Sequence, residues 1–252
     1  MLYPVNTCIV AAHGKIVSAA AVPFSGKMRC ASALLAAEFP HIESEETPMN
    51  DSLRVIGTRR YGTLSPLRYP GGKASLAGFF ADIITALGVE EAQYIEPYAG
   101  GAGAGIALLR EGIVRHLIIN DIDPAVHAFW RSVVAHNASF VELVMSTPLT
   151  VDEWLRQREI YRSRDESDTL RLGFAFFFLN RTNRSGILNA GVIGGQRQEG
   201  KYKIDARFNR QTLVERLAAI GDLADHITVS DLDGRTVIQR YSRDERSFMY
   251  ID

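Results

Sequence analysis

The sequence has only two cysteines and no long apolar run. Cys8 and Cys30 both lie near the start of the chain, without the paired spacing of a metal site and too few for a disulfide framework. No segment approaches the roughly 18 to 20 consecutive apolar residues of a membrane helix. The first residues also lack the basic start of a secretory signal. These absences predict a reduced, cytoplasmic protein with no membrane partner.

The sequence also lacks an excess of charge of either sign. Its 252 residues include 28 basic and 29 acidic side chains, and 46% of the residues are hydrophobic. This composition argues against a disordered chain and fits one α/β domain that carries a modest insertion. It does not exclude nucleic acid, because phosphate is bound by a local basic face and not by the overall charge.

Residues 1–48 differ from the rest because they are Ala-rich and weakly patterned. Three interpretations fit them: an appendage docked on the body, a flexible tail, or translated upstream sequence, since Met49 offers a later start. We favour a poorly ordered tail and treat residues 1–63 as an N-terminal extension. A helical period then runs over residues 71–87.

The remaining pattern predicts alternating strands and helices that are interrupted once. Strands are expected at 93–96, 116–120, 227–229 and 247–251, and helices at 103–111, 124–136, 151–164, 169–180, 210–223 and 235–241. Strands joined to helices by short connections predict a parallel sheet. The chain would then divide into a first half at 64–137, a mostly helical insertion at 138–224 and a return to the sheet at 225–252.

A glycine-rich turn joins the first strand to its helix. Glu96-Pro97-Tyr98 leads into Gly100 and Gly101, where backbone amides can closely approach a ligand. The dinucleotide fingerprint is not met, because the sixth position counted from Gly101 is Ile106. A carboxylate at position 96 would repel a pyrophosphate, so a cationic or zwitterionic ligand suits this turn better.

Asp121 stands just after the second strand, about 20 residues beyond the glycines, where a carboxylate accepts hydrogen bonds from ribose hydroxyls. It indicates an adenosine-bearing ligand without separating NAD from S-adenosylmethionine. The alternative is that residues 120–123 are only a polar turn that caps the next helix, although Asp123 alone could provide the cap.

Together these motifs resemble the Dam-like family of adenine-specific DNA methyltransferases. The family segment Pro-Leu-Arg/Lys-Tyr/Trp-x-Gly-Gly-Lys is matched at residues 66–73, and its acidic-Pro-aromatic-x-Gly-rich loop at residues 96–101. The resemblance covers about residues 64–252. It implies a Rossmann-like, S-adenosylmethionine-dependent methyltransferase sheet, with the cofactor in the first half and DNA recognition in the helical insertion.

The resemblance also implies roles for individual residues around the cofactor. Lys73 would neutralise the methionine carboxylate, Tyr69 would pack against the cofactor, and Glu96 would face its ammonium or sulfonium side. Asp121 matches the family's ribose-binding acid, and residues 227–233 match its third-strand motif. The implied cofactor-binding set is Tyr69, Lys73, Glu96, Pro97, Tyr98, Gly100, Asp121, Asp233 and Asp252.

The catalytic motif of the family is Asp-Pro-Pro-Tyr, of which only Asp252 stands in this sequence. In the family, the acid and the first proline's carbonyl accept the hydrogens of the adenine amino group, and the aromatic ring stacks on the flipped base. Asp252 is thus the predicted catalytic residue. We expect a chain truncated here, with C-terminal strands missing and an open hydrophobic sheet edge. Methylation by this chain alone is not expected.

A basic stretch follows the predicted helix at 169–180. Residues 181–210 contain seven basic and two acidic side chains interleaved with glycines, which suits a loop that follows a phosphate backbone. An uncommitted charged loop is the alternative. With the resemblance, duplex DNA is the predicted partner, and Asn183 and Arg184 are the best candidates for base-edge contacts. The predicted DNA-binding set is Arg181, Asn183, Arg184, Arg197, Lys201 and Lys203.

Three functions compete on these observations. The first is a truncated adenine-specific DNA methyltransferase whose working form belongs to a restriction-modification or phage-derived system. The second is a non-catalytic fragment that binds DNA or cofactor and needs a complementing chain. The third is a nucleotide-dependent oxidoreductase, which the glycine spacing disfavours. We expect no metal and favour a monomer.

Overall fold

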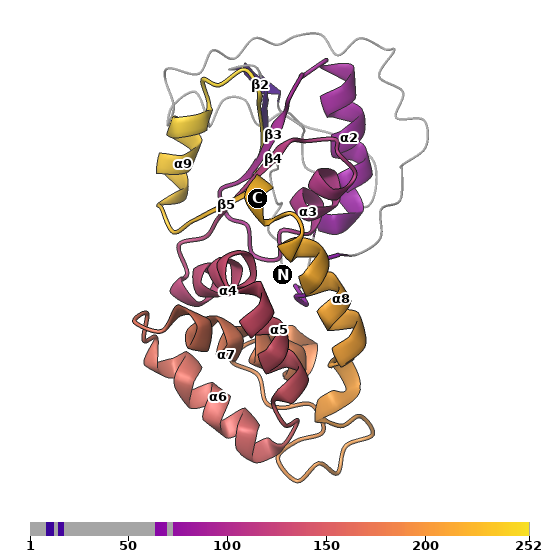
Figure 1. The fold of residues 1–252 in the computed structure, drawn as a ribbon, viewed down its shortest axis with the longest axis vertical. Helices are drawn as coiled ribbons and strands as arrows, with labels where there is room; N and C mark the ends of the chain where they lie inside the picture. The colour runs from indigo at the N-terminus through magenta and orange to yellow at the C-terminus, as the bar shows by residue number, and fades with distance from the viewer. Residues whose placement is uncertain (1–8, 13–14, 18–63, 70–72, 252) are drawn as a thin grey trace, which may run out of the picture.

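The computed structural model describes residues 9–12, 15–17, 64–69 and 73–251. At its centre is a six-stranded sheet with the order β2-β1-β6-β3-β4-β5 (Figure 1). Four neighbours run parallel: β6 (Ser247–Ile251), β3 (Gln93–Glu96), β4 (His116–Asn120) and β5 (Ile227–Ser230). The predicted parallel α/β sheet is confirmed, because apolar runs bounded by turns form strands that are buried on both faces.

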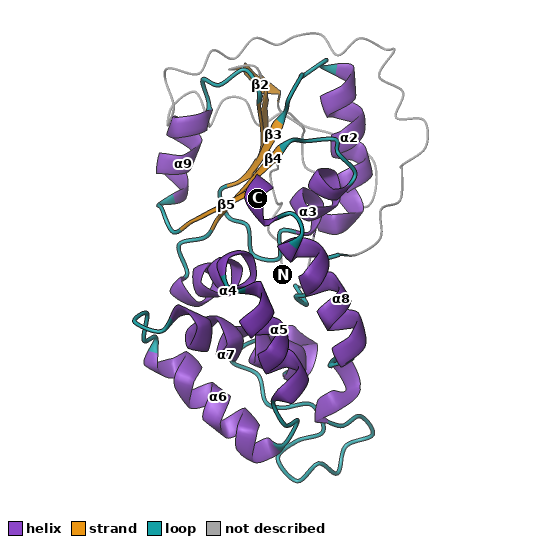
Figure 2. Ribbon diagram, viewed as in Figure 1, coloured by secondary structure: helices purple, strands orange, loops and turns teal. Residues whose placement is uncertain are grey.

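Alternation along the strands divides the core between the two faces of the sheet. Tyr94 and Phe248 point to one face, where they pack on Phe80 of α2 (Ala77–Ala86), with ring centroids 5.9 and 5.8 Å away. Ile95 and Met249 point to the other face and join a small cluster with Val237 of α9 (Gly234–Tyr241). Successive strand residues thus serve opposite layers, and Figure 2 shows α2 and α9 on opposite sides of the sheet.

The first layer is completed by the 3-10 turn η1 (Lys73–Leu76) and by α3 (Gly103–Arg110), which packs beside α2. In the described residues the sequence-based boundaries of β3, β4 and β6 agree with the structure, and those of α3 and α9 agree to within one residue. Buried strands and capped helices are well marked by their composition.

The insertion between β4 and β5 is helical, as predicted. It consists of α4 (Pro124–Ala135), α5 (Asn137–Ser146), α6 (Val151–Ser163), α7 (Thr169–Thr182) and α8 (Arg210–Gly221), with 3-10 turns η2 (Arg184–Gly186), η3 (Ile204–Arg207) and η4 (Ala224–His226). Helix α7 is its buried axis. A Cβ on Gly173 would lie 2.5 Å from the Ala128 carbonyl oxygen of α4, so glycine permits this close helix crossing.

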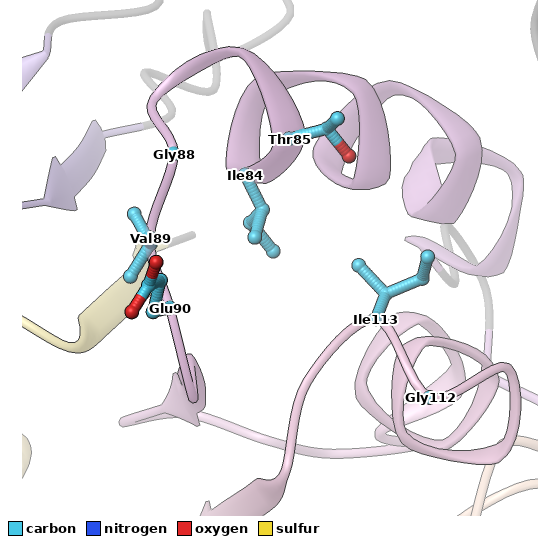
Figure 3. Close-up of a pocket in the computed structure, with 7 residues that line it drawn as sticks. All are labelled: Ile84, Thr85, Gly88, Val89, Glu90, Gly112 and Ile113. Carbon is cyan, nitrogen blue, oxygen red and sulfur yellow. The ribbon is translucent and has the colours of Figure 1, made fainter.

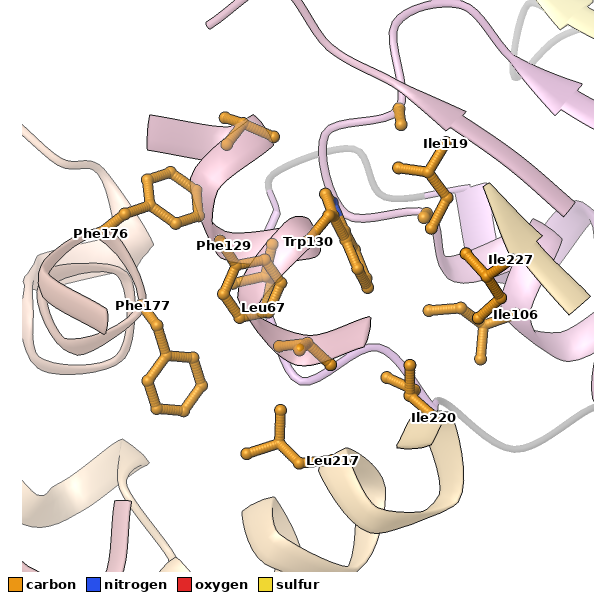
Figure 4. Packing of buried hydrophobic residues seen from close by; sticks show 14 of the residues in the cluster. Leu67, Ile106, Ile119, Phe129, Trp130, Phe176, Phe177, Leu217, Ile220 and Ile227 are labelled. Carbon is orange, nitrogen blue, oxygen red and sulfur yellow. The ribbon is translucent and has the colours of Figure 1, made fainter. Parts of the chain in front are cut away.

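One hydrophobic cluster joins the insertion to the sheet. Figure 4 shows Trp130 of α4 between Ile119 of β4 and the rings of Phe129 and Phe177. The Phe129 and Phe177 rings are stacked with centroids 5.9 Å apart. The insertion is therefore anchored by aromatic packing and is not a loosely attached module.

Three expectations need correction. The helix α5 was missed, because only one residue separates its start from the end of α4. The poorly ordered tail is wrong for β1 (Ile9–Ala12) and β2 (Lys15–Val17), which form an antiparallel pair. The open edge of the last strand is also wrong, because β1 pairs antiparallel with β6 in the register Ile9↔Ile251 to Ala12↔Phe248. Hydrogen-bonded pairing with β6 stabilises residues 9–12 as a strand although their hydrophobic pattern is weak.

Among the described residues, none of the helices is both long and apolar enough to cross a membrane.

Candidate functional site

The candidate site lies where the parallel strands end. Strands β3 and β4 end at Glu96 and Asn120, and because they are parallel both ends reach the same edge of the sheet. Asn120 is fully buried there. Its Nδ2 donates to the carbonyl oxygens of Pro97 (2.8 Å) and Leu232 (2.9 Å). Its Oδ1 accepts from the Leu232 amide (2.9 Å) and the Ser230 hydroxyl (2.7 Å), so one side chain ties together the loops after three strands.

The glycine turn after β3 is held by side chains from outside it. Trp130 Nε1 donates to the Gly100 carbonyl oxygen (2.8 Å), and Ser65 Oγ donates to the Gly101 carbonyl oxygen (2.6 Å). Both donors are buried. Sequence reasoning missed Asn120, Trp130 and Ser65 as site-forming residues, because their partners in the glycine turn lie 23 to 36 positions away.

Tyr69 lies over this turn. A Cβ on Gly100 would come within 2.8 Å of Tyr69 Cζ, and Gly100 has φ +47°, so glycine is required both by the contact and by the backbone. The ring remains 46% exposed. The pKa of the Tyr69 hydroxyl is raised by burial and then by the charges of Asp121 and Asp123. The tyrosine therefore faces the acidic turn after β4, as a residue packing on a ligand there would.

Asp121 is bound to the glycine turn. Its Oδ2 accepts a hydrogen bond from the Gly100 amide (3.0 Å), and its Oδ1 accepts one from the Asp123 amide (3.0 Å). Burial raises the pKa of this carboxyl, and the two amide hydrogen bonds oppose that shift. Asp123 provides the N-cap of α4, where its Oδ1 accepts from the Ala125 amide (2.8 Å). Capping therefore does not use Asp121.

Lys73 begins η1 on the other side of the same turn. The next residue, Ala74, lies close to Gly103, since a Cβ on Gly103 would be 3.0 Å from that of Ala74. The η1 turn therefore packs on the start of α3, directly after the glycines that Asp121 contacts. Lys73 and Asp121, the two residues expected to hold opposite ends of one cofactor, thus flank one turn. Residues 70–72 lie outside the described part of the chain.

Glu96, at the tip of β3, is buried. Its Oε1 accepts a hydrogen bond from the Gly105 amide (3.1 Å) in the first turn of α3. A carboxylate is favoured at this position because the N-terminus of a helix carries partial positive charge. The contact with a sulfonium or ammonium group stays a prediction.

The other expected cofactor residues surround this centre. Pro97 contributes the carbonyl oxygen held by Asn120, and the half-exposed Tyr98 ring covers Gly234, where a Cβ would be 2.4 Å from Tyr98 Cζ. Asp233 caps α9 through the Arg235 amide (2.8 Å). Asp252, the expected catalytic acid, lies outside the described residues and follows directly after β6.

The expected DNA-binding set divides into buried and exposed members. Asn183 is fully buried: its Oδ1 accepts from Trp154 Nε1 (2.7 Å), and its Nδ2 donates to the carbonyl oxygens of Ile187 (3.0 Å) and Leu188 (2.9 Å). The predicted base-edge contact of Asn183 is therefore wrong, because its amide is already used in the interior.

Arg181 is also turned inward, where it donates to the carbonyl oxygens of Pro66 (3.4 Å) and Arg207. Its pKa is lowered to about 10, first by burial and then by Arg68, Arg216 and Arg207. The remaining expected contacts are exposed: Arg184, Arg197, Lys201 and Lys203. They stand on the connection between α7 and α8, at the surface of the insertion.

A separate hollow is not part of this site. A pocket of about 410 Å³ is lined by the end of α2 and the connection after α3, including Ile84, Val89 and Ile113 (Figure 3). These residues precede β3 and β4, so the pocket lies at the opposite edge of the sheet from Asp121. In the part of the chain that the structure describes, no group of three or more His, Cys, Asp or Glu side chains could hold a metal ion. Whether the reaction uses a metal stays a prediction.

A comparison with protein families now adds to this geometry. The family described as D12 class N6 adenine-specific DNA methyltransferase matches residues 69–252, well over half of the chain. A search of curated proteins found no match. The match covers the glycine turn, Asp121, the helical insertion and β6, and it confirms the resemblance drawn from the sequence motifs.

Proposed function

The chain belongs to the D12 class of N6 adenine-specific DNA methyltransferases, and from that premise we propose its donor, its substrate and its residues. The reaction that we propose for this site is transfer of the methyl group of S-adenosylmethionine to the exocyclic amino group of adenine in duplex DNA, and the transfer assay below decides whether this chain performs it alone. The observation that carries the proposal is the glycine turn flanked by Tyr69, Asp121 and Lys73. The oxidoreductase alternative has no support from the family.

The residues around the glycine turn fit an adenosine with a charged amino-acid tail. Asp121 supplies a carboxylate at the carboxyl edge of the parallel strands, the usual place for a ribose acceptor in such sheets. The exposed Tyr69 ring supplies an apolar wall. Lys73 supplies the positive charge that a carboxylate tail requires. Residues 64–137 would form the cofactor half, 138–224 the DNA-recognition region and 225–252 the return to the sheet.

The proposed chemistry places the target amine at the end of β6. S-adenosylmethionine, when bound, supplies an electrophilic methyl group on sulfur. Asp252 would accept a hydrogen bond from the adenine amino group, whose nitrogen is a poor nucleophile because its lone pair is delocalised into the ring. As the N–CH3 bond forms, the S–CH3 bond breaks, S-adenosylhomocysteine leaves, and the methylated amine loses one proton. The position of Asp252 directly after β6, beside β3 in the sheet, supports this role, because Glu96 and the glycine turn stand at the same edge.

Binding of the cofactor is tested by isothermal titration of the purified chain with S-adenosylmethionine, and with NAD as the contrasting nucleotide. We expect binding of S-adenosylmethionine only. Asp121→Ala and Lys73→Ala should each weaken it by about tenfold or more, because each removes a hydrogen-bonded charge. The matched control is Arg115→Ala. Arg115 precedes β4, at the amino end of the parallel strands, and is paired with Glu91, so its removal should leave affinity unchanged. Binding of NAD in preference would refute the proposal.

Transfer is tested separately with tritiated S-adenosylmethionine and a plasmid, followed by nucleoside analysis. Label on N6-methyladenine that Asp252→Ala abolishes supports the proposed enzyme. If cofactor and duplex bind but no label appears, the alternative is correct and the chain is a non-catalytic fragment that needs a complementing chain.

A further inference from the structure

A second, smaller pocket lies between residues 65–69 and the basic connection that follows α7. Its volume is about 290 Å³, and its walls include three arginines, Arg68, Arg184 and Arg207, together with Tyr202 and Ile193. Arg184, Arg207 and Tyr202 are exposed, so the pocket opens to solvent. It combines a cationic wall with an apolar wall, as a site for a phosphate attached to a sugar would.

Within the described part of the chain, no acidic side chain pairs with the arginines of this pocket. None of the ion pairs among the described residues includes Arg68, Arg184 or Arg207. Arg68 donates to a neutral partner, the Asn183 carbonyl oxygen (3.0 Å). The pKa of the nearby Arg181 is lowered first by burial and then by the positive charges of Arg68, Arg216 and Arg207. Like charges gathered at one place are unfavourable until an anion joins them.

The backbone around the pocket is held by hydrogen bonds and a close contact. The side-chain amide of Asn180 accepts from the Arg68 amide (2.7 Å) and donates to the Arg68 carbonyl oxygen (2.9 Å). Gly186 has φ +75°, and a Cβ there would be 2.6 Å from the Arg68 carbonyl oxygen, so the turn after α7 closes directly on this residue. A preorganised cationic pocket loses little conformational freedom when a ligand binds.

We propose that Arg68, Arg184 and Arg207 form a binding pocket for one phosphodiester of the substrate duplex. The inference rests on the proposed function and extends it, because Arg68 and Arg207 were not among the expected DNA contacts. It also replaces the fully buried Asn183 and the partly buried Arg181 by a set in which Arg184 and Arg207 are exposed. A phosphodiester held here would fix the register of the duplex on the insertion without reading its sequence.

The test measures binding of a fluorescent duplex by anisotropy over a range of salt concentrations. Arg184→Gln and Arg207→Gln should each weaken binding and make the slope of log K against log salt shallower, by at most about 0.9, which is the value for complete loss of one phosphate contact. Arg207→Lys should keep the wild-type slope, because it keeps the charge. Arg115→Gln, which removes an equal charge at the far edge of the sheet, should also keep it.

A second arm identifies the phosphate. Single methylphosphonate substitutions are scanned through the duplex, and one position should weaken wild-type binding while leaving Arg184→Gln and Arg207→Gln unaffected. Thermal melting of each variant shows that it is folded, and two variants are used so that one misfolded protein does not decide the result.

The outcomes separate the two proposals. If wild-type binding is steep in salt but both pocket variants keep its slope and its methylphosphonate pattern, the pocket assignment is overturned while DNA binding stands. If wild-type binding does not depend on salt, the duplex substrate itself is refuted.

Discussion

Neighbouring residues at the end of β4 serve opposite purposes. The amide of Asn120 is fully buried and makes four hydrogen bonds within the protein. The carboxylate of Asp121 accepts two amide hydrogen bonds at the glycine turn and keeps acceptor capacity for a ligand. Side-chain alternation at the end of the strand therefore separates the residue that builds the site from the residue proposed to bind the cofactor.

The raised pKa of Asp121 predicts how cofactor affinity depends on pH. Protonation of the Asp121 carboxyl removes its charge and turns one of its acceptor oxygens into a donor. Cofactor affinity should therefore fall as the pH drops through a pKa that lies above the ordinary value for aspartate. Below that pKa the dissociation constant should rise by about tenfold per pH unit. The measurement is isothermal titration of wild type and Asp121→Asn from neutral to acidic pH.

The sign for stability is opposite, which provides a control. A raised carboxyl pKa means that the folded chain binds the proton more tightly than the unfolded chain. Ionisation of Asp121 therefore lowers the free energy of unfolding as the pH rises through the range around its pKa, and acidification raises it again. Asp121→Asn should bind the cofactor weakly at every pH. A wild-type affinity that stays constant on acidification would contradict the assignment of Asp121.

Single residues were placed correctly where a motif assigned them and incorrectly where only the residue type did. Tyr69, Gly100 and Asp121 were expected together and do lie together. Asn183 was misassigned because an asparagine in a basic segment has the same sequence signature whether it contacts DNA or fills the interior. Its partner Trp154 lies 29 positions away, and only the folded chain brings the two together.

At the scale of elements, the short segment 65–69 is held from several directions. Asn180 holds its backbone at Arg68, and Arg181 and Arg216 donate to the carbonyl oxygens of Pro66 and Ser65. The segment in turn holds the glycine turn through Ser65. Helices α7 and α8 of the insertion thus position residues beside the sheet.

Asn180→Ala should therefore affect both stability and cofactor binding. It leaves the Arg68 amide without its partner, at a cost of about 1 to 3 kcal/mol in the free energy of unfolding. It should also weaken S-adenosylmethionine binding severalfold, because Tyr69 follows Arg68. Urea unfolding and isothermal titration measure the two effects.

The matched control is Asn137→Ala, which removes hydrogen bonds to Val133 and Leu217 at a distance from the glycine turn. It should lower stability to a similar extent and leave cofactor affinity unchanged. Equal loss of affinity in both variants would show that the effect is general destabilisation.

The predictability of the elements follows from how each is stabilised. Strands β3, β4 and β6 were located correctly because each has two or more consecutive apolar residues that are buried on both faces of the sheet and bounded by polar residues or turns. Helix α5 was missed because only His136 separates it from α4, and no turn residue marks the break. Strand β1 was missed because its partner β6 is more than 230 residues away, and a weak local pattern contains no information about such a partner. Strand β2 pairs only with β1 and was missed along with it.

At the scale of the whole molecule, the two ends of the sequence meet in one sheet. Strand β1 lies between β2 and β6, so its backbone pairs on both sides. It covers the edge of β6, the strand that leads to Asp252. An edge strand left uncovered presents unpaired amides and carbonyls that recruit other chains.

Val10→Pro should disrupt this arrangement. Val10 pairs with both Tyr250 and Val17, so proline removes an amide from the ladder at a position with neighbours on both sides. We expect a lower melting temperature and concentration-dependent association, measured by thermal melting and light scattering. Val10→Thr keeps the amide and the β-branched side chain and should resemble wild type. A Val10→Pro variant that melts like wild type would show that β1 does not stabilise the sheet.

The consecutive residues Arg68 and Tyr69 contact two different sites: the first lines the arginine pocket and the second covers the glycine turn. If a bound phosphate immobilises Arg68, the neighbouring Tyr69 has less conformational entropy left to lose when a nucleoside binds against its ring. Binding of the two ligands is then thermodynamically linked. The factor by which bound duplex raises the affinity for the nucleoside equals the factor by which the bound nucleoside raises the affinity for duplex.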